Sequence, residues 1–143
     1  MHEAPLTPEL YCVDISKSLP FYIDVLGFRI EYERTEEGFA MLERQGSRIM
    51  LDQLSSDPSL SWLAAPLERP FGRGINLQIR TDNVDELYKQ VKISGSEIFL
   101  SIEDKWYRAD DVYVGSRQFI VLDPDGYMLR FYEDIGVRDQ RPE

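Results

Sequence analysis

Short stretches in which apolar and polar residues alternate recur along the chain, and this period of two predicts strands. In the first half they cover residues 9–13, 28–33, 38–43 and 48–54. Between the first two stretches the spacing becomes helical, with Ser16 as the expected N-cap and Gly27 as the expected stop. The apolar residues at helical spacing are Leu19, Tyr22, Ile23 and Leu26.

The second half of the chain repeats this order. Strands are predicted at residues 75–81, 97–101, 117–122 and 127–133, and residues 101–115 are expected to be an irregular loop. The tetrapeptide Asp123-Pro124-Asp125-Gly126 predicts a tight turn, because proline presets φ and glycine accepts a positive φ. The predicted helix carries Val84, Leu87, Tyr88 and Val91 on one face and ends at Gly95.

The two halves are also in register. Asp14 and Asp82, and likewise Gly27 and Gly95, are 68 residues apart (82 − 14 and 95 − 27). We therefore predict a single α+β domain over residues 1–143, made of two tandem βαβββ modules. The expected parts are module one at about 7–54, a connector at 55–74, module two at about 75–135 and a polar, mobile tail at 137–143.

Composition limits the function. The formal net charge of −10, from 26 acidic and 16 basic residues, disfavours nucleic acid and anionic membranes as partners. One cysteine, Cys12, cannot form an intrachain disulfide, and neither a signal peptide nor a membrane-spanning run is recognisable, so a cytoplasmic location is expected. With His2 as the one histidine, a His-based metal site or catalytic triad is not expected within one chain.

Three segments carry a resemblance to a known family: the helix start Ser18-Leu19-Pro20-Phe21-Tyr22, the following Val25-Leu26-Gly27-Phe28, and the late Asp123–Tyr127 turn. The chain resembles the glyoxalase / bleomycin resistance / extradiol dioxygenase superfamily over roughly residues 7–135. This resemblance implies the vicinal oxygen chelate fold, in which paired βαβββ modules form a cup-shaped mixed sheet. It says little about activity, because the fold hosts many functions.

Family enzymes usually hold a divalent metal at four strand positions. Carried over to this sequence, these positions fall near Thr7 or Pro8, at residues 50–52, on Asn76 and on Arg130. Only Asp52 could supply a carboxylate there, and arginine offers donors but no acceptor. The resemblance therefore implies neither a metal site nor another cofactor. We hypothesise that Arg130 pairs with Asp52 in place of the metal.

Within the superfamily the chain is most similar to the metal-free bleomycin resistance proteins. That resemblance implies a homodimer that sequesters a cationic aromatic antibiotic, or a related small molecule, in a cleft between protomers without turnover. One alternative is a metal-independent, or unexpectedly metal-dependent, lyase or isomerase of the same superfamily that acts on a small oxygenated metabolite, with Asp52, Tyr113 or Arg130 as acid–base or oxyanion groups. Another alternative is a structural or partner-binding domain, in which side chains fill the cup and leave no room for a ligand.

Candidate ligand-binding residues are the aromatic side chains of the expected loops together with polar or apolar residues near the former metal positions. The aromatic groups could stack on flat heteroaromatic rings, whereas their more common role is to pack loops onto a sheet. The predicted site residues are Phe39, Asp52, Trp62, Phe71, Asn76, Trp106, Tyr107, Tyr113 and Arg130.

Overall fold

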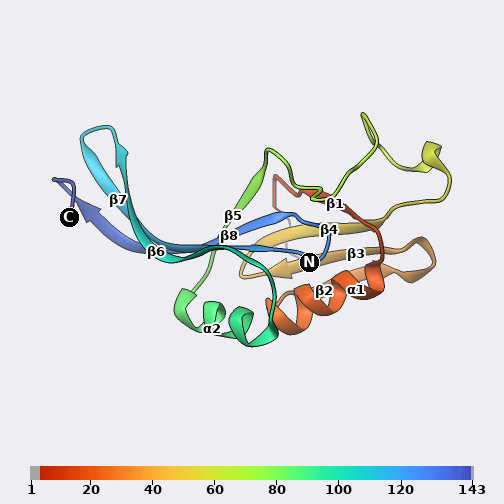
Figure 1. The fold of residues 1–143 in the computed structure, drawn as a ribbon, viewed down its shortest axis with the longest axis horizontal. Coiled ribbons are helices and arrows are strands. Elements are labelled where there is room, and N and C mark those ends of the chain that lie inside the picture. The colour runs from red at the N-terminus through yellow and green to blue at the C-terminus, as the bar shows by residue number, and fades with distance from the viewer. Residues whose placement is uncertain (1–3, 143) are drawn as a thin grey trace. The chain divides into compact units, whose positions relative to one another are not determined.

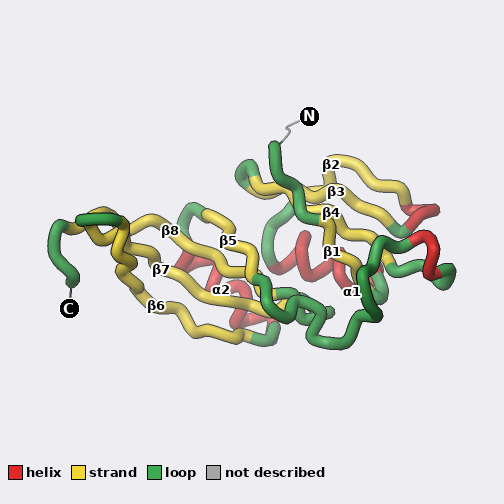
Figure 2. Tube along the Cα trace, turned by 90° about the horizontal axis from the view of Figure 1, so that it is seen from above, coloured by secondary structure: helices red, strands yellow, loops and turns green. Residues whose placement is uncertain are grey.

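The computed structural model describes residues 4–142, so His2 lies outside the described residues. The chain forms two compact units. The first runs to Arg73 and includes Pro124–Tyr127, and the second comprises Gly74–Asp123 and the chain from Met128 onward. Each unit contains one four-stranded sheet and one main helix (Figures 1 and 2). The predicted α+β class and the two βαβββ modules are confirmed, whereas the single-domain assignment stays a prediction.

In the first unit the sheet order is β1-β4-β3-β2, with β1 parallel to β4 and the other pairs antiparallel. Alternation places Leu42 and Leu51 on one face, where Tyr22 and Leu26 also pack, all four being fully or almost fully buried. The elements are β1 (Glu9–Cys12), α1 (Ile15–Pro20), a π-helical turn (Phe21–Val25), β2 (Arg29–Arg34), a 3₁₀ turn (Thr35–Glu37), β3 (Phe39–Arg44), β4 (Ser47–Gln53) and a second 3₁₀ turn (Pro58–Leu60).

The start of the first helix differs from the prediction. Asp14, not Ser16, is the N-cap, because its carboxylate accepts hydrogen bonds from the backbone N–H and the hydroxyl of Ser16. Pro20 is the last residue of α1. It cannot donate to the carbonyl four residues earlier, and the chain continues as a π-helical turn in which the N–H of Leu26 bonds the carbonyl of Phe21.

The second unit repeats the topology with order β5-β8-β7-β6. Val84, Leu87 and Val91 of its helix are buried, and the rings of Phe119 and Phe131 stack below them with centroids 5.7 Å apart. The elements are β5 (Asn76–Arg80), α2 (Val84–Ser94), β6 (Ile98–Ala109), β7 (Val112–Leu122) and β8 (Met128–Arg138).

The prediction of an irregular loop at residues 101–115 was wrong. Strands β6 and β7 continue through it as a hairpin, which turns at Asp110 with a φ of +57°. Aromatic and β-branched residues of this stretch favour a pleated conformation, so their number indicated strand instead of loop. The expected tail is also shorter than predicted, because β8 runs to Arg138. In Figure 1 the three strands extend together beyond α2 as a ribbon.

The predicted turn after Asp123 forms, and its residues Pro124–Tyr127 belong to the first unit. The buried carboxylate of Asp125 accepts hydrogen bonds from the N–H of Val13 at 3.3 Å and the hydroxyl of Ser18 at 3.4 Å, and pairs with Arg69 at 2.9 Å. The turn is therefore a packed structural element of that unit. Among residues 4–142, no helix combines the length and apolar character that crossing a bilayer requires.

Candidate functional site

An acid-lined hollow of about 850 Å³ lies in the first unit. Asp52 on β4 and Glu36 and Glu37 of the 3₁₀ turn supply its carboxylates, and Ile15, Leu54 and Leu60 are apolar groups on its wall. In the sheet register Asp52 stands opposite Phe39 of β3. The hollow thus combines negative charge with an apolar rim.

The carboxylate of Asp52 is half-buried among like charges. Burial raises its pKa above the ordinary value, Glu9 and Glu37 raise it further, and Arg34 opposes them. Within the described chain no group donates a hydrogen bond to this carboxylate. Arg34 is instead held by Glu37, with Nε 2.5 Å from the carboxylate oxygen. Asp52 is therefore the acid of this hollow that would gain most from an added cation.

Two other predicted residues of the first unit have different environments. Phe39 is 5% exposed, and the guanidinium of Arg34 lies 4.0 Å from its ring centroid. Trp62 is 85% exposed in the connector, where its backbone N–H donates to the hydroxyl of Tyr11 at 3.0 Å. Phe39 is thus part of the packed sheet, whereas the indole of Trp62 is accessible.

Phe71 packs on the late turn. Its backbone N–H donates to the carbonyl of Asp125 at 2.9 Å, and its ring meets that of Tyr127 edge-on with centroids 6.0 Å apart. The ring of Phe71 is therefore engaged in the structure of the first unit.

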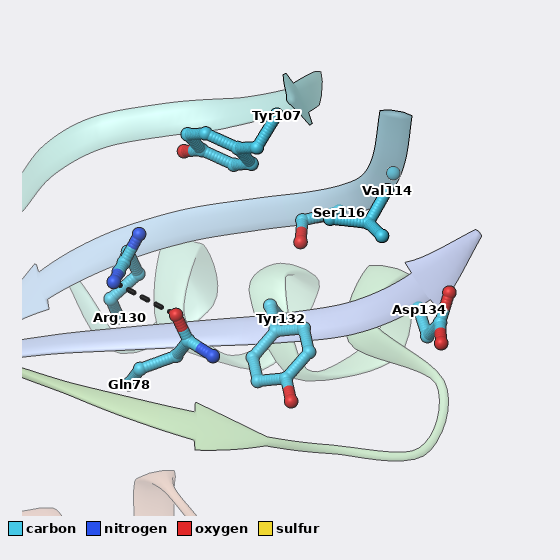
Figure 3. Close-up of a pocket in the computed structure, with 8 residues that line it drawn as sticks. Gln78, Tyr107, Val114, Ser116, Arg130, Tyr132 and Asp134 are labelled. Atoms are coloured by element: carbon cyan, nitrogen blue, oxygen red, sulfur yellow. Dashed lines mark hydrogen bonds between the residues drawn. The ribbon is translucent and has the colours of Figure 1, made fainter. Parts of the chain in front are cut away.

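A second hollow, of about 540 Å³, lies in the second unit on the sheet face opposite α2. Figure 3 shows Arg130 and Tyr132 projecting from β8, Gln78 from β5 and Tyr107 from β6. Arg130 Nη2 donates to Gln78 Oε1 at 2.9 Å. The lining residues are Gln78, Tyr107, Val114, Gly115, Ser116, Arg130, Tyr132 and Asp134.

The phenol of Tyr107 is fixed by a residue that the sequence did not single out. Gln118, buried on β7, donates from Nε2 to the Tyr107 hydroxyl at 2.7 Å. Gln78 and Tyr132 were also missed. Alternation along β8 from Arg130 would have indicated Tyr132, whereas Gln78 requires the parallel β5–β8 register, which places it opposite Arg130.

The remaining predicted residues lie elsewhere in the second unit. Trp106 faces away from Tyr107, crossing over Gly115 on the other side of the sheet, with the guanidinium of Arg138 5.2 Å from its ring centroid. Tyr113 pairs with Arg108 and Arg138. It is two residues from Gly115 on β7 and therefore lies on the same side of the sheet as Trp106. Asn76 is exposed at the start of β5. Of the three hairpin aromatics, the structure thus places Tyr107 at the hollow.

The side chains near the family's metal positions do not suit a divalent ion. Arg130 is a permanent cation without an acceptor, and Asn76 offers an uncharged amide. Within residues 4–142, no three histidine, cysteine, aspartate or glutamate side chains are grouped so that they could hold one metal ion. The predicted pairing of Arg130 with Asp52 stays a prediction.

Comparison with known proteins agrees with the fold and identifies relatives. A bleomycin resistance protein of Geobacillus stearothermophilus is 31% identical over 137 residues, covering 90% of this chain and 95% of that protein. One from Staphylococcus aureus (strain MRSA252) matches with the same identity and coverage. The crystal structure of TioX from Micromonospora sp. ML1 superposes with a TM-score of 0.70 at 20% identity, over 93% of this chain and all of that chain, and supports the fold alone. Residues 5–131 match the Glyoxalase/Bleomycin resistance protein/Dioxygenase superfamily, and the chain belongs to this superfamily.

Proposed function

We propose that this protein has a bleomycin-resistance role and sequesters a cationic, aromatic small molecule of the bleomycin class without turning it over. The observation that carries the proposal is the acid-lined hollow around Asp52, in a chain that is 31% identical to bleomycin resistance proteins over nearly its whole length. The identity indicates the ligand class, and the hollow supplies groups suited to it.

Asp52 is the central group of this proposal. A cation beside it would relieve the repulsion from Glu9 and Glu37 and provide a partner for the carboxylate. Leu54 and Leu60 would contact the apolar part of the ligand. The net charge of −10 would attract a cationic ligand at long range, and this attraction weakens as salt screens it.

Trp62 supplies an aromatic surface in the same unit. Its indole is 85% exposed and can stack on a flat heteroaromatic ring. A homodimer and a cytoplasmic location are also part of the proposal. Exposed apolar side chains of the second unit, Ile93, Phe99 and Val137, are available for contact with a second copy.

Isothermal titration calorimetry with metal-free bleomycin tests the proposal. After dialysis against EDTA, the protein should bind a stoichiometric amount of drug, and the affinity should fall as NaCl is raised. Mass spectrometry should recover the drug chemically unchanged after long incubation. Absence of binding at tens of micromolar drug, or recovery of a modified drug, would contradict sequestration of this class. Sedimentation velocity of the same sample checks the dimer.

A further inference from the structure

The hollow of the second unit is rich in groups that can donate a hydrogen bond. Arg130 contributes a guanidinium, and Tyr107, Ser116 and Tyr132 contribute hydroxyl groups. The one carboxylate on the wall, Asp134, is already engaged, because its Oδ1 accepts a hydrogen bond from the N–H of Gly136 at 2.8 Å. A ligand that brings acceptors could therefore be bound by the guanidinium and by the hydroxyl groups together.

Arg130 is only partly satisfied. Its Nη2 donates to Gln78, whereas its Nε is buried and has no hydrogen-bond partner within residues 4–142. A buried donor without an acceptor costs free energy, and because Nε is enclosed by protein atoms, a ligand in the hollow would meet the guanidinium at its terminal Nη groups. The planar fork of arginine matches the two oxygens of a carboxylate, which can accept both hydrogen bonds at once.

The hydroxyl of Tyr107 can donate a hydrogen bond to a ligand in the hollow. It already accepts a hydrogen bond from Gln118 Nε2 at 2.7 Å, so its own O–H remains for donation. Gln118 is 4% exposed and fixes the phenol from within the sheet. In Figure 3 the Tyr107 ring extends along the hollow towards the end where Arg130 stands. A guanidinium and a phenol thus converge on the same end of the hollow.

The remaining wall restricts the ligand further. The rings of Tyr107 and Tyr132 and the side chain of Val114 offer contacts to a flat apolar body. Asp134, four residues along β8 from Arg130, would repel a second negative charge. A singly charged anion on a ring therefore fits better than a phosphate dianion.

We propose that the hollow of the second unit is a binding site for an aromatic carboxylate, with Arg130 receiving the carboxylate and Tyr107 donating a further hydrogen bond. This proposal goes beyond the proposed function, because it concerns other residues and a ligand of the opposite charge. Its failure in a test would leave the proposed binding of a cationic drug untouched, and the reverse also holds.

NMR titration of the full-length ¹⁵N-labelled protein tests this site with benzoate, its uncharged analogue benzamide and inorganic phosphate. The Arg130 Nε–Hε signal is assigned by its loss in Arg130→Lys. Benzoate should shift this signal saturably, and benzamide and phosphate should bind at least about tenfold more weakly, since a charge-assisted bidentate contact is lost or poorly formed. Benzamide or phosphate binding as tightly as benzoate would overturn the proposal.

Variants then locate the site. Arg130→Gln should weaken benzoate binding at least about tenfold, whereas Lys89→Gln, at an exposed position of α2 on the other side of the sheet, should leave it unchanged. Unchanged affinity in Arg130→Gln, or equal losses in both variants, would refute the assignment. If Arg130→Gln does not fold, Tyr107→Phe replaces it. A loss of about threefold or more then supports the site, and no loss overturns it.

Discussion

Replacement of Asp52 by asparagine separates the role of its charge from that of its shape. Asparagine keeps the size of the side chain and removes the negative charge. Asp52 receives no hydrogen bond within the described chain, and its attraction to Arg34 is opposed by repulsion from Glu9 and Glu37, so the substitution breaks no hydrogen bond of the unliganded fold. Any loss of drug affinity therefore reports on the interaction of the carboxylate with the ligand.

The magnitude follows from the position of Asp52. Two opposite charges about 4 Å apart attract by roughly 1 kcal/mol in water and about 4 kcal/mol at an effective dielectric of 20. Asp52 is half-buried on the wall of an open hollow, so solvent screens it and the lower part of this range applies. We expect a loss of about 1–2 kcal/mol in Asp52→Asn, which corresponds to about five- to thirtyfold weaker binding of bleomycin.

The direction in which drug affinity changes with pH follows from the raised pKa of Asp52. Because burial raises the pKa of Asp52, the carboxylate begins to protonate at a higher pH than an ordinary aspartate. Drug affinity should be complete above the raised pKa and fall as the pH decreases through it, and Asp52→Asn should abolish this decrease. The free energy of unfolding depends on pH in the opposite direction from the drug affinity. The folded state favours the protonated carboxyl, so this group lowers the free energy of unfolding as the pH rises from the ordinary value through the raised pKa.

The assay is calorimetric titration with bleomycin over a range of acidic to neutral pH, combined with urea unfolding of each variant. Asp52→Asn should bind more weakly and yet be as stable as the native protein, or slightly more stable, at neutral pH. Glu33→Gln is the matched control, because Glu33 is an exposed carboxylate of β2 outside the hollow. An Asp52→Asn protein that binds the drug normally, or one no weaker than Glu33→Gln, would refute the role of Asp52.

Three further substitutions test the fold and the aromatic contact. Gly126→Ala places a Cβ against Pro70 Cβ and 2.6 Å from Pro70 Cα at a φ of +91°, and urea unfolding should show a loss of about 3 kcal/mol. Arg48→Met leaves Glu31, whose side chain is 3% exposed and 2.7 Å from the guanidinium, without this partner, and should lower the free energy of unfolding by about 3–5 kcal/mol. Trp62→Phe should leave stability within about 0.5 kcal/mol and remove most of the acrylamide-quenchable fluorescence. It should also weaken bleomycin binding by about two- to tenfold.

Each of these substitutions has a control within the chain. Gly27→Ala has a comparable φ of +83° but meets no atom closer than 3.7 Å, so it should cost only about 1 kcal/mol. Arg48→Met combined with Glu31→Leu should recover much of the lost stability, because no buried charge then remains unpaired at this pair. If quenching is lost in Trp106→Phe rather than in Trp62→Phe, the assignment of the accessible indole is wrong.

Strands and the late turn were readable from the sequence because their determinants are local. Alternation located the strands of the first unit to within a residue or two, and Asp123–Gly126 specified its own turn. The failures have equally local causes. Asp14 and Ser16 are both good capping residues, and only the observed hydrogen bonds distinguish them. In the β6–β7 hairpin, charged residues on both faces obscured the period of two.

The candidate sites were only partly accessible to sequence reasoning. Asp52, Tyr107 and Arg130 were selected, and each lines a hollow, although its role in binding stays a prediction. Gln78 and Gln118 could not be selected, because their importance comes from strand register and not from their neighbours in sequence. Trp106 and Tyr107 were treated alike, since a loop has no fixed faces, whereas a strand sends adjacent side chains in opposite directions.

The late turn also has a consequence for the order in which the chain can mature on the ribosome. Pro124–Tyr127 complete the first unit, and Asp125 holds both the N–H of Val13 and Arg69. Synthesis from the N-terminus therefore delivers the helix and strands of this unit long before the carboxylate that joins them. The nascent first unit lacks the contacts of Asp125 until Tyr127 has left the exit tunnel. Resistance of that unit to proteolysis should therefore be acquired late in translation.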